Sequence, residues 1–181
     1  MVSVSYVFPN VAGIPQRSGL MKRWVLAKNL GCDYVEVPAD FVKNQTEIDK
    51  TGLELGDFLT KDAVAELYEQ DRDVPKELKY ILHTEPSLVR HDGYGIRYQA
   101  PLKWHDKEWR GQVVSMTLSI SKFFSKPAAI IEIHPGDKRN SFEDLVESMR
   151  LLVDKYDAEF KVKPLILLEN RTGQFISSVS G

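Results

Sequence analysis

The chain has 181 residues, of which 43% are hydrophobic and 28% are charged, and its formal net charge is −2. This apolar content excludes global disorder, and the length fits a single domain. A pI near 6.1 excludes a protein that coats nucleic acids by charge alone.

The sequence carries no sign of a membrane span or of an oxidising compartment. No apolar run approaches the ~20 residues that cross a bilayer, and residues 1–10 lack the pattern of a signal peptide. The single cysteine, Cys32, excludes an internal disulfide. We therefore expect a cytoplasmic protein without membrane contact.

Strand and helix patterns alternate along the chain. Short apolar or alternating runs predict strands, and apolar residues three and four apart predict helices. The expected strands are residues 2–8, 33–37, 79–83, 128–134 and 164–169. The expected helices are residues 19–30, 60–70, 106–124 and 141–156. The long stretch 85–105 shows neither the helix nor the strand periodicity of apolar residues.

This alternation predicts an α/β fold with parallel strands and right-handed crossovers. The candidates are an open doubly wound sheet and a TIM-type β/α barrel. The segment PNVAGIPQRSG after the first strand lacks the glycine spacing of a phosphate-binding loop, which does not support the open sheet. A full barrel needs about 250 residues and eight strands. We expect residues 1–181 to form one incomplete barrel domain, either the N-terminal part of a longer barrel or a short one that covers its open edge as a homo-oligomer.

Three expected strands end at residues that can bind metal or move a proton: His83, His134 and Glu169. A fourth strand carries Glu36. Because the carboxyl ends of parallel strands form one mouth, these side chains are expected to converge there. Imidazole and carboxylate together suit a divalent metal, Zn²⁺ first and Mn²⁺ or Fe²⁺ next.

Glu132 lies two residues before His134 and therefore points to the same face, deeper in the sheet. We favour a buried acid paired with Lys or Arg. The alternative is a residue that does not bind the metal itself but orients one of its ligands through a hydrogen bond.

Two motifs follow these strands: HPG at 134–136, and LLENRTGQ at 167–174. Together they resemble the xylose-isomerase-like TIM-barrel superfamily, most closely its endonuclease IV branch. The resemblance implies that His83, His134 and Glu169 are metal ligands. The segment GCDYVEV, which contains Glu36, instead resembles the sugar isomerase and epimerase relatives. Arg171 and Thr172 depart from the repair-enzyme motif, and the branch's remaining ligands come from later strands that this chain lacks.

The resemblance leaves three functions open. In the first, the ion activates a water that cleaves DNA at an abasic site, which the HPG and ENxxGQ motifs favour. In the second, Glu36 or Glu169 moves a proton on a sugar or sugar phosphate in an isomerase or epimerase, which YVEV and the acidic pI favour. The third is a barrel relative without catalysis.

A predicted loop at 90–110 interleaves basic and aromatic residues and would lie over the mouth. Such a loop can stack bases or sugars and pair phosphates, or it can be an ordinary solvated loop with some aromatic packing underneath. Its candidate stacking residues include Trp104 and Trp109. The candidate substrate-binding residues are Tyr94, Arg97, Asn170 and Arg171.

Overall fold

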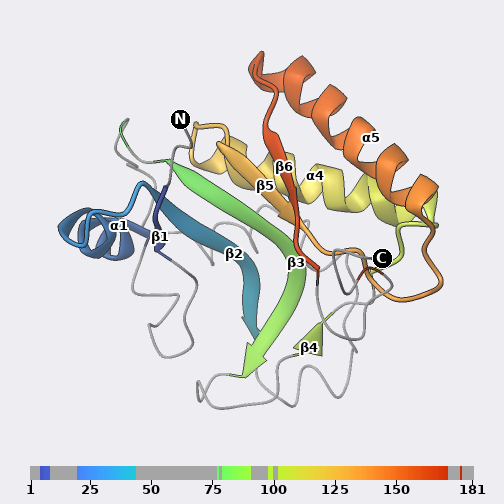
Figure 1. The fold of residues 1–181 in the computed structure, drawn as a ribbon, viewed down its shortest axis with the longest axis horizontal. Helices are drawn as coiled ribbons and strands as arrows, with labels where there is room; N and C mark the ends of the chain where they lie inside the picture. The colour runs from blue at the N-terminus through green and yellow to red at the C-terminus, as the bar shows by residue number, and fades with distance from the viewer. Residues whose placement is uncertain are drawn as a thin grey trace.

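A computed structural model describes residues 5–8, 20–43, 77, 79–90, 98, 99, 102–170 and 176. They form an α/β structure in which helices pack along a mainly parallel sheet (Figure 1). The strands are β1 (Val7–Phe8), β2 (Tyr34–Lys43), β3 (Tyr80–Arg90), β4 (Tyr98–Gln99), β5 (Ile130–Ile133) and β6 (Leu165–Leu168). The helices are α1 (Leu20–Asn29), α4 (Lys107–Phe123) and α5 (Phe142–Phe160).

The sheet runs in the order β1-β2-β3-β5-β6, and every neighbouring pair in this order is parallel. The short β4 pairs antiparallel with β3 and lies off this path. The expected α/β class and parallel pairing are therefore confirmed. None of the described helices has the length and apolar character that a membrane span requires.

Several expected boundaries were wrong. Strand β3 continues to Arg90 because its second half pairs with the second half of β2, a long-range contact that local periodicity does not reveal. Helix α5 ends one turn later than expected, at Phe160, where Lys161 adopts a left-handed conformation with φ 57°. Within the first expected strand, 2–8, residues 7–8 form β1 and residues 5–6 do not belong to a strand, while residues 2–4 lie outside the described residues. The expected helix at 60–70 lies outside the described residues.

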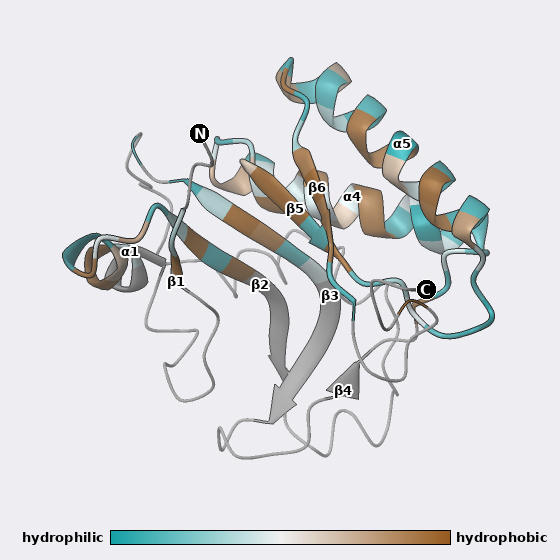
Figure 2. Cartoon of the chain, in the orientation of Figure 1, coloured by the Kyte–Doolittle hydropathy of each residue, from teal (hydrophilic) through white to brown (hydrophobic). Residues whose placement is uncertain are grey.

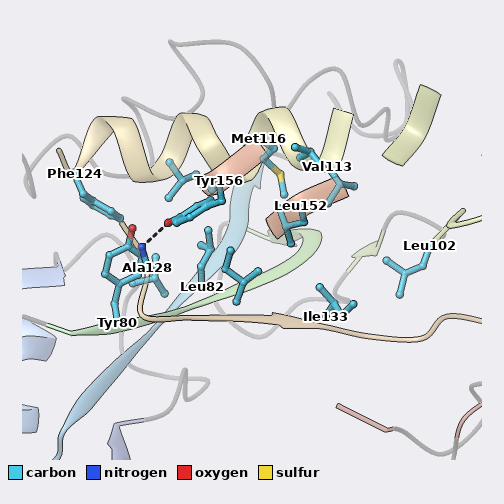
Figure 3. Packing of buried hydrophobic residues seen from close by; sticks show 14 of the residues in the cluster. Tyr80, Leu82, Leu102, Val113, Met116, Phe124, Ala128, Ile133, Leu152 and Tyr156 are labelled. Atoms are coloured by element: carbon cyan, nitrogen blue, oxygen red, sulfur yellow. Dashed lines mark hydrogen bonds between the residues drawn. The ribbon is translucent and has the colours of Figure 1, made fainter. Parts of the chain in front are cut away.

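Alternation along the strands gives the sheet two different faces. Tyr80 and Leu82 of β3 and Ile131 and Ile133 of β5 are buried in one cluster with the inner sides of α4 and α5 (Figure 3). In Figure 2, β6 and most of β5 are coloured as hydrophobic, whereas α4 and α5 alternate between hydrophobic and hydrophilic residues. The residues between them, which include His83 and Glu132, point to the opposite face.

Buried hydroxyl groups join this core to the start of β5. The Tyr156 hydroxyl of α5 accepts a hydrogen bond from the Ala128 N–H (Figure 3) and lies 2.7 Å from Ser121 Oγ of α4. The Tyr80 hydroxyl donates to the Lys126 carbonyl oxygen at 2.7 Å. Burial raises the pKa of Tyr156, so the phenol stays neutral. The network therefore fixes where β5 begins relative to both helices.

Tyr156→Phe is expected to lower the free energy of unfolding by about 1–3 kcal/mol, because the buried Ala128 N–H loses its acceptor. Urea denaturation followed by circular dichroism measures this loss. Tyr34→Phe is the matched control, since the described contact of Tyr34 is through its ring, with the Lys79 ammonium 5.9 Å from the centroid. Equal stability of the two variants would show that the hydroxyl network contributes nothing.

Candidate metal centre

The register of three adjacent strands brings the candidate ligands to one place. His83 of β3 pairs with Glu132 of β5, and Glu132 pairs with Leu167 of β6. The Glu169 N–H donates to the Ile133 carbonyl oxygen at 2.9 Å, which holds Glu169 beside His134. Residues separated by up to 86 positions (169 − 83) thus meet on one face of the sheet. His134 and Glu169 directly follow β5 and β6, whereas His83 lies inside β3, so the expected strand end at His83 was wrong.

One donor atom from each of four side chains lies within 4.8 Å of the others: His83, Glu132, His134 and Glu169. The two imidazole Nε2 atoms are 2.6 Å apart. Glu132 Oε1 is 3.5 Å from His83 Nε2 and 3.9 Å from His134 Nε2. Glu169 Oε2 is 3.3 Å from His134 Nε2. The expected convergence of His83, His134 and Glu169 is present in the structure.

The group is closed on one side and open on the other. Both histidines are buried, and the Glu132 side chain is 13% exposed. The Glu169 side chain is 42% exposed, so a molecule from solvent would reach the group at this carboxylate.

These four residues fit a divalent ion. Two nitrogens bound to one ion, each about 2.0–2.1 Å from it, lie roughly 3 Å apart, so the rings need to separate only slightly. Two carboxylates balance the charge of a divalent cation, and imidazole with carboxylate suits Zn²⁺, Mn²⁺ or Fe²⁺.

Glu132 was expected on the same face as His134, and the structure agrees. Its carboxylate lies near both imidazoles, and the favoured pairing with Lys or Arg stays a prediction. Sequence reasoning underrated Glu132 because the register between β3 and β5, which sets it against His83, is not visible in the sequence of β5.

Glu36 does not join the group. It is half-buried on β2 and pairs with Ile81, two residues before His83, so it shares the face of the sheet but lies at a deeper level. Among the described donor atoms, the group contains no oxygen of Glu36.

The other candidate residues are less informative. Asn170 is exposed directly after Glu169. Tyr94, Arg97 and Arg171 lie outside the described residues. Trp104 and Trp109 are buried and pack edge to face with centroids 4.9 Å apart, so these two side chains fit the alternative of aromatic packing beneath the loop rather than stacking on a ligand.

The turn after His134 is held by side chains that sequence reasoning missed. Trp104 Nε1 donates to the His134 carbonyl oxygen at 2.8 Å. Asn140 Nδ2 donates to the Leu102 carbonyl oxygen at 2.9 Å, joining the turn to the segment before α4. Gly136 has φ +76°, and a Cβ there would lie 2.5 Å from Asn140 Nδ2. The only local signal was the HPG motif, since these contacts span 30 and 38 residues.

The same turn contains an exposed ion pair. Arg139 donates to both carboxylate oxygens of Asp137, and these hydrogen bonds lower the pKa of Asp137 to about 2. The two opposite charges compensate each other, so this exposed pair is not part of the four-residue group.

A comparison with models of known protein families finds no match, and a comparison with curated proteins finds none either. The similarity to the xylose-isomerase-like superfamily therefore rests on the HPG and ENxxGQ motifs and remains a prediction.

Gly136→Ala is expected to destabilise the protein more than Gly31→Ala. Both glycines have positive φ, which costs an alanine about 1–2 kcal/mol, but a Cβ at Gly31 meets no atom within 4 Å. The crowding at Gly136 displaces Asn140 or Leu102 and loosens His134. Denaturation measures the stability of both variants, and calorimetric titration with Mn²⁺ measures their metal affinity. Similar values for the two variants would contradict the role assigned to this turn.

Proposed function

We propose that this protein is a divalent-metal-dependent phosphodiester hydrolase of the endonuclease IV type, acting on DNA at an abasic site. The observation that carries the proposal is the meeting of His83, His134 and Glu169 on one face of three adjacent parallel strands, where β5 and β6 end, with contacts of 2.6 and 3.3 Å. The motifs HPG and ENxxGQ start at two of these residues and select this chemistry among the possible uses of a metal.

We further propose that the sheet is an arc of a β/α barrel. Its parallel strands follow one another in chain order, without the reversal that marks a doubly wound sheet. Leu165 and Leu167 lie on the same face as Glu132 by register and are 63% and 43% exposed. Apolar residues on this face suit the interior of a barrel, where strands are covered on both sides.

The residues have different parts in this mechanism. The buried His83 and His134, together with Glu169, would hold a divalent ion, which would supply activation of a bound water and stabilisation of charge on the phosphate oxygens. The Glu169 carboxylate, which is partly exposed at the open side, is placed to accept a proton from the attacking water. The exposed Asn170 amide can donate to a phosphate oxygen.

A sugar or sugar-phosphate isomerase is the second candidate. Glu36 favours it, because this half-buried carboxylate lies on the same face of the sheet as His83. Its place below the group makes it a weaker candidate for direct proton transfer than Glu169.

The test is nicking of a duplex with one abasic site, using protein loaded with Zn²⁺ or with Mn²⁺. Glu169→Gln is expected to lower the nicking rate roughly 100-fold or more, because it removes a ligand charge and a proton acceptor. Glu143→Gln, an exposed position on α5, is the control and should retain the rate.

Other outcomes decide between the candidates. Ketose–aldose interconversion without nicking would favour the isomerase. Bound metal without either activity would favour a relative that lacks catalysis. Absence of metal binding, with His134→Ala indistinguishable from the unmodified protein, would refute both enzymatic functions.

A further inference from the structure

We infer that Glu132 is a direct ligand of the ion, so that the centre has two imidazole and two carboxylate ligands. This inference rests on the proposed metal-dependent function and adds a fourth ligand to the three that the motifs imply. A fourth protein ligand also reduces the number of coordination positions that remain for a substrate, and this number differs between ions.

The position of Glu132 follows from the backbone. It is the register partner of His83 across β3 and β5, and it lies two residues before His134 on β5. All three side chains therefore leave the sheet on the same face. Its carboxylate lies on the closed side of the histidine pair, and Glu169 lies on the open side.

The atom that Glu132 approaches distinguishes a ligand from an orienting residue. A carboxylate that orients a ligating histidine accepts from the ring nitrogen that does not bind the metal. Here the short distances of Glu132 Oε1, 3.5 and 3.9 Å, are to Nε2 of His83 and of His134. These are the nitrogens that face each other at 2.6 Å and that one ion would bind. Glu132 thus occupies the place of a ligand.

A fourth protein ligand limits the choice of ion. Zn²⁺ in proteins is mostly four-coordinate, and four protein ligands close its shell, as in structural zinc sites. Mn²⁺ and Fe²⁺ accept six ligands, so about two positions remain for water and a phosphate or sugar oxygen. The inference therefore favours Mn²⁺ or Fe²⁺ over Zn²⁺ as the ion that supports a reaction.

Mn²⁺ itself is the probe for this test. Titration of the full chain, followed by the electron paramagnetic resonance signal of free Mn²⁺, gives the affinity. Water-proton relaxation gives the number of exchangeable waters on the bound ion. The unmodified protein is expected to retain about two waters. Glu132→Ala should retain about three and bind Mn²⁺ roughly 10–100-fold more weakly or worse.

The control and the remaining variant keep the result interpretable. Glu132→Gln preserves the shape of the side chain and should also weaken Mn²⁺ binding if Glu132→Ala fails to fold. Glu143→Gln on α5 should match the unmodified protein in affinity and in water number.

The outcomes separate this inference from the function on which it rests. Weaker Mn²⁺ binding by Glu132→Ala or Glu132→Gln with an unchanged water number would mean that Glu132 orients a ligand without binding the ion itself. Unchanged affinity would mean that Glu132 has no role in Mn²⁺ binding. Either result overturns the inference and leaves the proposed function standing. Failure of the unmodified protein to bind Mn²⁺, Zn²⁺ or Fe²⁺ would overturn both.

Discussion

The register between β3 and β5 is the constraint on which the candidate site depends. It is set by main-chain pairing and by the Ala129 N–H, which donates to the Tyr80 carbonyl oxygen at 3.1 Å. The Thr84 hydroxyl adds a hydrogen bond to the Glu132 carbonyl oxygen at 2.8 Å. A slip of one residue would turn the side chains of one strand to the opposite face and separate His83 from Glu132. The hydrophobic face opposes such a slip, because it would expose Leu82 or Ile131.

The sequence was sufficient for the parts of the structure that depend on local pattern. The strand ends beside His134 and Glu169 follow from short apolar runs that stop abruptly, and parallel pairing follows from the alternation of strands with helices. The extension of β3 to Arg90 and the burial of Trp104 could not be foreseen, because both depend on contacts with distant segments. Glu132 is an intermediate case: its face was evident from its spacing to His134, but its neighbour across the sheet was not.

The candidate site combines a well-packed sheet with a set of polar side chains whose burial lowers the stability of the fold. Two imidazoles and a nearly buried carboxylate are held together on a sheet whose other face is packed with apolar residues. Grouping these polar side chains opposes folding, since each loses water and the carboxylates repel one another. The hydroxyl network at Tyr156 and the turn at Gly136 provide contacts that hold the surrounding backbone in place. A bound cation would reduce the cost further, so any metal binding at this group would be linked to folding stability.

The two carboxylates differ in exposure, so the four-residue group has a buried side and a side that faces solvent. The Glu132 side chain is 13% exposed and faces the two imidazoles, whereas the Glu169 side chain is 42% exposed and also faces solvent. Both are glutamates, so their chemistry is the same and only their positions along the strands distinguish them. Glu132 comes before the end of β5 and Glu169 comes directly after β6, which places one at the floor and the other at the rim. A carboxylate at the floor suits a permanent ligand, and one at the rim can both bind and exchange a proton with a substrate. Since β5 and β6 end at the paired residues Ile133 and Leu168, the different heights of the two carboxylates come only from their positions along the strands, one residue before one end and one residue after the other.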